Sequence, residues 1–201
     1  NDHMALQGRE AGEGGLRDGV LVMIGYEHND RDGVNHYLVF GTDQVARGKD
    51  RPQQYIDAVR AAGGIGFIAH PFERRRYFRR LPPYPWTDWS VRGFDGLEIW
   101  NQMSDWAERI RTWGSVVRFV YPRRFLVGAP AELLRTWDQL SRERFVAGVG
   151  GVDAHTRVLR LGPFSYTVFP LRVEFEDPFV QSFRQDLLGF VVADSGNGGH
   201  L

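Results

Sequence analysis

The stretch Gly148-Val149-Gly150-Gly151-Val152-Asp153-Ala154-His155 is an apolar run that ends on an acid and a histidine two positions apart. In a β-strand, residues two positions apart share a face, so the side chains of Asp153 and His155 are expected to point the same way. The glycines leave space for a ligand or a neighbouring backbone near the strand end. Such a pair can hold a metal ion or form an ordinary hydrogen bond, and the neighbouring strands decide between these interpretations.

Three other apolar runs lead to polar residues in the same way. They are residues 20–24 before Glu27, residues 65–69 before His70 and residues 94–100 before Asn101. Parallel strands that are buried on both faces have continuous apolar sequences, and α/β-barrel enzymes carry their reactive groups at the carboxyl ends of such strands. The pattern therefore predicts that these polar residues gather at one end of a sheet.

Amphipathic helical patterns alternate with the apolar runs. The first covers residues 50–62, with Asp50 as the expected capping residue and Pro52 in the first turn. Further helical patterns cover residues 106–113, 130–140 and 177–187. This alternation of strands and helices predicts a mainly parallel sheet or a barrel.

The composition is typical of one compact globular domain. With 201 residues, of which 42% are hydrophobic, the chain can bury a sizeable core, so we expect a single domain over residues 1–201. Lys and Arg together number 25, as do Asp and Glu, and this balance favours neither nucleic acid nor a membrane as partner. The chain has no cysteine, so a metal ion would have nitrogen and oxygen ligands only. It has neither a signal-peptide pattern nor an apolar segment of about 20 residues, and we expect a cytoplasmic protein.

A series of short motifs follows the strand ends in a definite order. The motifs are Asn1-Asp2-His3, Gly25-Tyr26-Glu27, His36 within residues 35–41, Ala69-His70-Pro71, Glu98-Ile99-Trp100-Asn101 and Gly151-Val152-Asp153-Ala154-His155. In this order and spacing the chain resembles the PHP (polymerase and histidinol phosphatase) superfamily, and most of all its stand-alone metal-dependent phosphoesterases. The resemblance implies an irregular (β/α)7 barrel, similar to a TIM barrel, that hydrolyses phosphate esters with bound metal ions.

The resemblance also implies the roles of individual residues. Glu27 would bridge two ions, with His36 and His70 on one of them, Asp153 on the other, and His3 and His155 on a third. Two or three divalent ions are thus expected, and nitrogen and oxygen ligands suit Mn, Zn or Fe. The catalytic residues would be Glu27, His70, Asp153 and His155. Members of the superfamily begin with a His-x-His motif that does not precede Asn1 here, so we expect a domain that lacks its first βα unit.

Arginines follow the expected ligand His70 at a short distance. Arg74, Arg75 and Arg76 are candidates for binding a phosphate group, because a guanidinium binds two phosphate oxygens at once. A solvated basic loop is the alternative interpretation. The expected substrate is a small phosphorylated molecule, with a nucleotide as one candidate, whereas nucleic acid is not favoured.

Several assignments stay open at the sequence level. His28 is adjacent to Glu27 and should face the opposite side of the strand, so we do not expect it to bind metal. Glu98 and Asn101 either orient the metal-binding histidines or make ordinary buried hydrogen bonds. The sequence is also consistent with two functions other than phosphoester hydrolysis. One is a non-catalytic PHP-like scaffold, and the other is a metal-dependent amidohydrolase that cleaves C–N bonds.

Overall fold

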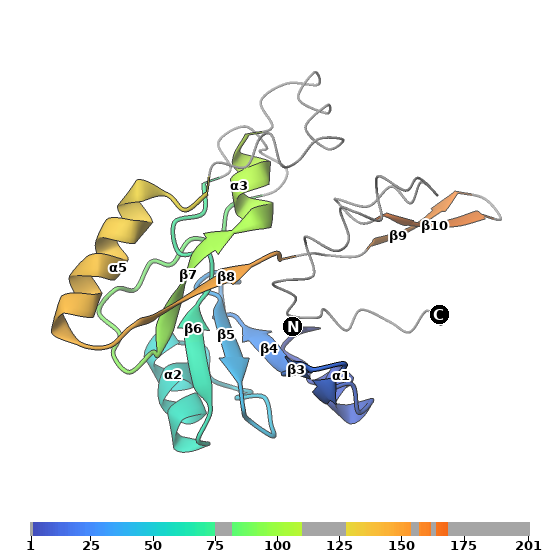
Figure 1. Ribbon diagram of the computed structural model, residues 1–201, viewed down its shortest axis with the longest axis horizontal. Helices are drawn as coiled ribbons and strands as arrows, with labels where there is room; N and C mark the ends of the chain where they lie inside the picture. The colour runs from blue at the N-terminus through green and yellow to red at the C-terminus, as the bar shows by residue number, and fades with distance from the viewer. Residues whose placement is uncertain (1, 75–81, 110–127, 154–156, 162–163, 169–201) are drawn as a thin grey trace.

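The structure, a computed structural model, describes residues 2–74, 82–109, 128–153, 157–161 and 164–168 (Figure 1). Its main sheet has six strands in the order β1-β4-β5-β6-β7-β8. These strands are β1 (Asp2–His3), β4 (Gly25–His28), β5 (Tyr37–Phe40), β6 (Ile65–Ile68), β7 (Gly96–Asn101) and β8 (Ala147–Gly151). Two hairpins pair β2 (Gly15–Arg17) with β3 (Val20–Val22) and β9 (Arg157–Leu161) with β10 (Phe164–Val168). The described helices are α1 (Gln7–Glu10), α2 (Pro52–Ala61), α3 (Gln102–Glu108) and α5 (Ala131–Glu143).

The expected (β/α)7 barrel is wrong for the described part of the chain, because the main sheet is open and mixed. Strand β5 runs antiparallel to both β4 and β6, whereas the pairs β1–β4, β6–β7 and β7–β8 are parallel. Within the described residues β1 and β8 form the two edges of this sheet and do not pair with each other. The physical reason lies in the connection between β4 and β5, where residues 29–36 are too few for the helical crossover that a parallel pair requires.

The run at residues 20–24 was expected to form a buried strand, and this prediction is wrong. Its first three residues form β3, which pairs only with β2 and leaves Val20 61% and Leu21 65% exposed. The hairpin turn is made by Asp18 and Gly19, both with positive φ, as in the tight turns that suit the twist of a hairpin. The strand that carries Glu27 starts afterwards, at Gly25.

Two of the expected helices are confirmed. Helix α2 packs on β6 and buries Tyr55, Ile56 and Val59, while α5 packs on β7 and buries Leu133. The expected cap of α2 is wrong, because the helix starts after Arg51 and no side chain caps it. Helix α3 covers the first part of residues 106–113, and the rest of that pattern, like the helix expected at residues 177–187, lies outside the described residues.

Aromatic side chains fill the centre of the core. Tyr26 and Tyr37 come from the sheet, Tyr55 comes from α2 and Trp86 comes from the connection before β7, and all four are buried. The rings of Tyr37, Tyr55 and Trp86 lie close together, with 5.7 Å between the centroids of Tyr37 and Tyr55. Among the helices that the structure describes, none is both long and apolar enough to cross a bilayer.

Candidate metal centre

The strand directions bring several polar side chains to one end of the sheet. Because β5 is antiparallel, its first residue lies beside the last residues of β4 and β6, with Tyr37 opposite both His28 and Ile68. His36 precedes β5 and His70 follows β6 by two residues, so both lie at this end. Glu27 stands in β4, and His3 is its partner on β1.

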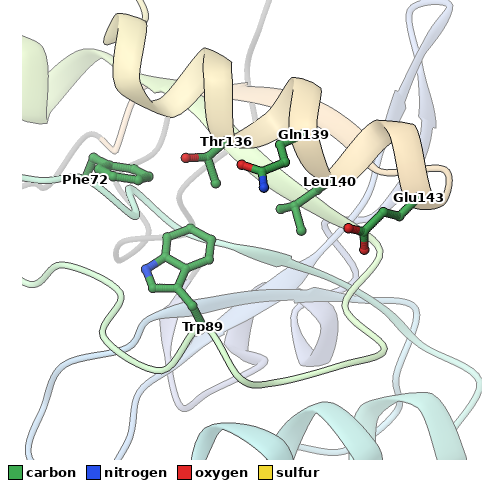
Figure 2. Close-up of a pocket in the computed structure, with 6 residues that line it drawn as sticks. All are labelled: Phe72, Trp89, Thr136, Gln139, Leu140 and Glu143. Atoms are coloured by element: carbon green, nitrogen blue, oxygen red, sulfur yellow. The ribbon is translucent and has the colours of Figure 1, made fainter.

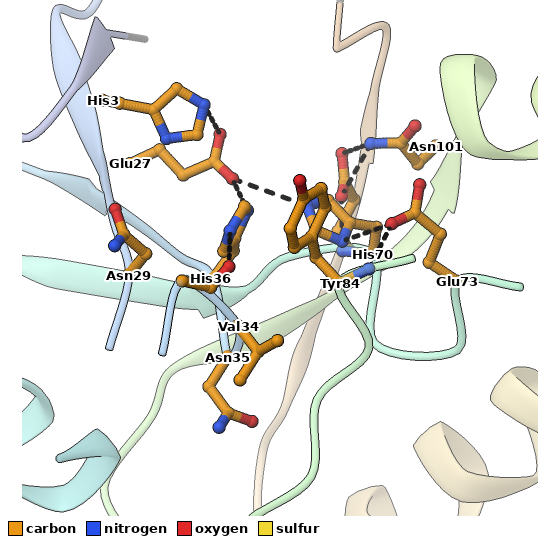
Figure 3. A network of polar contacts seen from close by, with 12 residues as sticks. His3, Glu27, Asn29, Val34, Asn35, His36, His70, Glu73, Tyr84 and Asn101 are labelled. Carbon is orange, nitrogen blue, oxygen red and sulfur yellow. Dashed lines mark hydrogen bonds and ion pairs between the residues drawn. The ribbon is translucent and has the colours of Figure 1, made fainter. Parts of the chain in front are cut away.

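Glu27 is the centre of a cluster that includes three histidines (Figure 3). Its Oε1 lies 2.5 Å from Nδ1 of His36 and 3.4 Å from Nε2 of His70, and its Oε2 lies 3.9 Å from Nε2 of His3. One ligand atom each from His3, Glu27 and His36 falls within 4.8 Å of the others. Glu27, His36 and His70 are buried, whereas the His3 side chain is 47% exposed, so the cluster meets solvent on the His3 side.

The contact between Glu27 and His36 determines what the cluster can hold. Nε2 of His36 lies 3.1 Å from the carbonyl oxygen of Gly33, and a carbonyl accepts only, so Nε2 carries a proton. The other ring nitrogen, Nδ1, is buried without an aligned hydrogen bond and faces the carboxylate at 2.5 Å. Two electron-rich atoms at this distance repel each other unless a proton lies between them. A metal ion bonded to both atoms at about 2.0–2.2 Å would require them to move apart. Metal-binding histidines commonly donate their second N–H to a backbone carbonyl in this manner.

His70 is surrounded by carboxylates. Burial lowers its pKa, but the hydrogen bond and charge of Glu27, with the charges of Glu98 and Glu73, outweigh burial and raise the pKa to about 10. Burial likewise raises the pKa of Glu27, yet its close contacts with His36 and His70, and the charges of the two histidines, dominate and hold the pKa well below its ordinary value. Without metal, the Glu27 carboxylate therefore faces a protonated His70.

The backbone at His70 is in an unfavourable conformation. Its φ is 27°, in the left-handed region, and the following Pro71 favours an extended residue at this position. Such strain costs on the order of 1–3 kcal/mol and occurs mainly at functional sites. The backbone N–H of His70 donates to Oε2 of Glu98 at 2.7 Å, which fixes this conformation.

Glu98 and Asn101 are hydrogen-bonded to each other, and Glu98 holds the backbone of His70. Nδ2 of Asn101 lies 3.1 Å from each carboxylate oxygen of Glu98. Burial raises the pKa of Glu98 to about 7, and the charge of Asp153 adds to this rise although attraction to His70 opposes it. A Cβ atom at Gly151 would lie 1.9 Å from Oε1 of Glu98, so the glycine provides the space for this carboxylate.

Asn35 fixes the segment before His36. Its side chain donates to Asp30 at 2.6 Å and accepts the backbone N–H of Thr87 at 2.6 Å, and its carbonyl accepts the hydroxyl of Tyr55. These bonds tie the loop between β4 and β5 to the connection before β7. His36 is therefore placed by a buried polar network rather than by a strand alone.

Sequence reasoning missed two residues of this site, Glu73 and Tyr84. The Tyr84 ring stacks on His36 with 5.1 Å between centroids and 16° between planes. Glu73 accepts the backbone N–H of Tyr84 at 2.8 Å and lies 3.9 Å from Nδ1 of His70. Both belong to the long connection after His70, which carries no strand or helix pattern, so only its closeness in sequence to His70 pointed towards the site.

The structure thus brings His3, Glu27, His36 and His70 together. Asp153 follows β8 with φ 50° and lies near enough to Glu98 to influence its pKa. Arg74 forms an ion pair with Glu132 of α5, whereas His155, Arg75 and Arg76 lie outside the described residues.

His28 turns away from the cluster, which confirms the expectation for this residue. Its Nε2 lies 2.9 Å from the carbonyl oxygen of Lys49, and its ring centroid lies 4.3 Å from that of Tyr55. His28 therefore belongs to the core, although it is the direct neighbour of Glu27.

A cavity of about 300 Å³ lies between α5 and the connection before β7 (Figure 2). It is lined by Phe72, Trp89, Thr136, Gln139, Leu140 and Glu143. None of the clustered histidines lines it, so it is separate from the candidate metal centre.

No protein-family model and no curated protein sequence matches the chain. The resemblance to the PHP superfamily therefore stays a prediction from the motifs.

Proposed function

We propose that this protein is a metal-dependent phosphoesterase whose first metal ion is held by Glu27, His36 and His70, with His3 beside them. The observation that carries the proposal is that one ligand atom each from His3, Glu27 and His36 lies within 4.8 Å of the others. The order of the motifs adds support, since the same residues are those that the superfamily resemblance implies.

The donor set fits a divalent transition metal. Imidazole nitrogens with carboxylate oxygens, and no sulfur, suit Mn, Zn or Fe. Asp153 and His155 stay the proposed ligands of further ions. A bound divalent ion supplies Lewis acidity, which polarises a phosphoryl oxygen and activates water at neutral pH.

The chain's own residues prepare this site in two ways. Glu27 keeps a low pKa and therefore presents an anionic carboxylate at any physiological pH. His70 must release its proton before it can bind metal, because an imidazolium has no lone pair to donate. Metal binding should therefore release protons and become tighter as the pH rises.

The proposed substrate is a small phosphorylated molecule, with a nucleotide as one candidate. Arg74, Arg75 and Arg76 are the proposed phosphate contacts. Arg74 and its partner Glu132 have side chains that are 45% and 50% exposed, so a phosphate group competes with Glu132 for this guanidinium in water.

A non-catalytic scaffold is a second candidate, and one observation favours it. The buried Glu27 carboxylate and the protonated His70 attract each other without a metal ion, because their charges are opposite. In that case the cluster would only join β4, β5 and β6. Uptake of metal separates this candidate from the phosphoesterase.

The proposal is tested with the full-length protein, first by elemental analysis and then by assays with added Mn²⁺ or Zn²⁺ on phosphate monoesters, nucleotides and amides. We expect bound metal and hydrolysis of phosphate esters, and we expect Glu27→Gln to lower the rate at least about 100-fold. His28→Gln is the matched control, because its side chain lies on the other face of the same strand and should leave the rate unchanged. Hydrolysis of amides alone would assign the amidohydrolase instead, and a protein without metal or activity would support the scaffold.

A further inference from the structure

Glu73 occupies a position that the proposed chemistry does not yet use. Its carboxylate side chain is fully buried and makes contacts with three different segments. Oε1 accepts the hydroxyl of Ser104 in α3 at 2.9 Å, and Oε2 accepts the backbone N–H of Tyr84 at 2.8 Å. Burying a carboxylate is costly unless hydrogen bonds compensate, so these bonds hold the group in one orientation.

In that orientation Glu73 faces the far side of His70. Nε2 of His70 is directed at Glu27, and Nδ1 is directed towards Oε2 of Glu73 at 3.9 Å (Figure 3). Nδ1 is buried and has no hydrogen-bond partner among the described residues. The 3.9 Å separation is longer than a hydrogen bond, so the role proposed below requires the ring to move closer to Glu73.

A metal ion on Nε2 would leave the remaining proton of His70 on Nδ1. A neutral imidazole that donates the Nε2 lone pair to a metal carries its proton on Nδ1. A buried N–H without an acceptor is unfavourable, and the Glu73 carboxylate is in place to accept it. Carboxylates that accept this second N–H fix the tautomer and the ring orientation of metal-binding histidines.

We infer that Glu73 is a positioning residue for His70, which selects the tautomer that presents Nε2 to a metal ion beside Glu27. This inference rests on the proposed function, because it assigns His70 as a metal ligand. Glu73 also joins this ligand to the connection that carries Tyr84, whose ring covers His36. One buried carboxylate thereby sets the positions of two parts of the site.

The test is calorimetric titration of the full-length protein with Zn²⁺ alone. Glu73→Gln should weaken Zn²⁺ binding by about 10-fold or more, as is common when a partner of a metal ligand is lost. Glutamine keeps the size of the side chain and can keep the bonds to Tyr84 and Ser104, so the change isolates the charge that faces Nδ1. Glu132→Gln is the matched control, since it removes an exposed carboxylate near the same connection and should leave Zn²⁺ affinity unchanged.

A second readout separates positioning from support of the fold. In the Zn²⁺-loaded wild type, nitrogen-15 NMR of the His70 ring should show metal on Nε2 and a hydrogen-bonded proton on Nδ1. Wild-type affinity in Glu73→Gln, or the opposite tautomer in the wild type, would overturn the inference alone. If the wild type takes up no Zn²⁺, the proposed function fails as well. If Glu73→Gln does not fold, the tautomer of His70 in the wild type decides whether the inference holds.

Discussion

At the scale of single residues, burial and neighbouring charges have opposite effects on the protonation of the site. Burial alone would favour a neutral histidine at position 70 and neutral carboxyls around it. The hydrogen bond and the charge of Glu27 reverse this preference and favour Glu27 and His70 as an ion pair in the absence of metal. A metal ion on Nε2 would take the place of one proton of His70, so the pair is compatible with the proposed metal binding.

The proton on His70 predicts how the stability of the metal-free protein depends on pH. The pKa of His70 rises from 6.5 to about 10 on folding, so between these values the folded protein holds a proton that the unfolded chain has lost. The free energy of unfolding should therefore fall as the pH rises through this range, by roughly 1 kcal/mol per pH unit. Urea denaturation at pH 6, 8 and 10 in the presence of a chelator measures this dependence.

The variant His70→Gln supplies the control for this prediction, because glutamine does not titrate. Its stability should change much less between pH 6.5 and 10 than that of the wild type. Equal slopes for both proteins would show that His70 is not protonated in the folded state, and the electrostatic description of the cluster would then be wrong.

At the scale of elements, the glycine at the end of β8 leaves room for Glu98, which binds the backbone of His70. Gly151 leaves the space that Oε1 of Glu98 occupies, whereas a Cβ at Gly150 would meet only Trp100, at 3.8 Å. Gly151→Ala should therefore displace Glu98 and destabilise the protein by roughly 1–3 kcal/mol. Gly150→Ala, one position earlier on the same strand, should change stability by less than about 0.5 kcal/mol.

Thermal and urea unfolding of the two alanine variants measure this difference, and a Zn²⁺ titration of each adds a functional readout. Gly151→Ala should also bind Zn²⁺ less tightly, because Glu98 holds the backbone of His70. Two variants of equal stability would show that Glu98 does not need this space.

The elements also show how far the sequence could predict the structure. Apolar runs at residues 65–69 and 94–100 correspond to β6 and β7, and helices α2 and α5 follow their amphipathic patterns. The run at residues 20–24 misled because hydrophobicity alone does not say whether a strand is buried, and it lies in an exposed hairpin. The direction of β5 could not be read from its residues, since a short apolar strand has the same composition in parallel and antiparallel sheets.

For the site, the sequence identified the residues at strand ends but not those that hold them. Glu27, His36 and His70 stand beside apolar runs and carry metal-binding groups. Both features can be recognised in the sequence. Glu73 and Tyr84 lie in a connection without periodicity, and their closeness to the histidines depends on tertiary packing. Long-range contacts of this kind leave no local pattern.

At the scale of the whole molecule, an open mixed sheet gathers the cluster at one end. The antiparallel β5 is the central feature, because it brings the start of one strand, and with it His36, next to the ends of β4 and β6. The convergence that a barrel of parallel strands was expected to provide is achieved here by two reversals of strand direction (Figure 1). Within the described residues, the cluster forms without closure of the sheet.

The central claim is that a metal ion lies between Glu27, His36 and His70. The most direct measurement is an anomalous difference map, recorded at the zinc absorption edge, from crystals of the full-length protein grown with Zn²⁺. We predict a strong peak at bonding distance, about 2.0–2.2 Å, from the Glu27 carboxylate and from the imidazole nitrogens that face it. A map with no peak at these three residues, or with Zn²⁺ bound only elsewhere on the protein, would contradict the account.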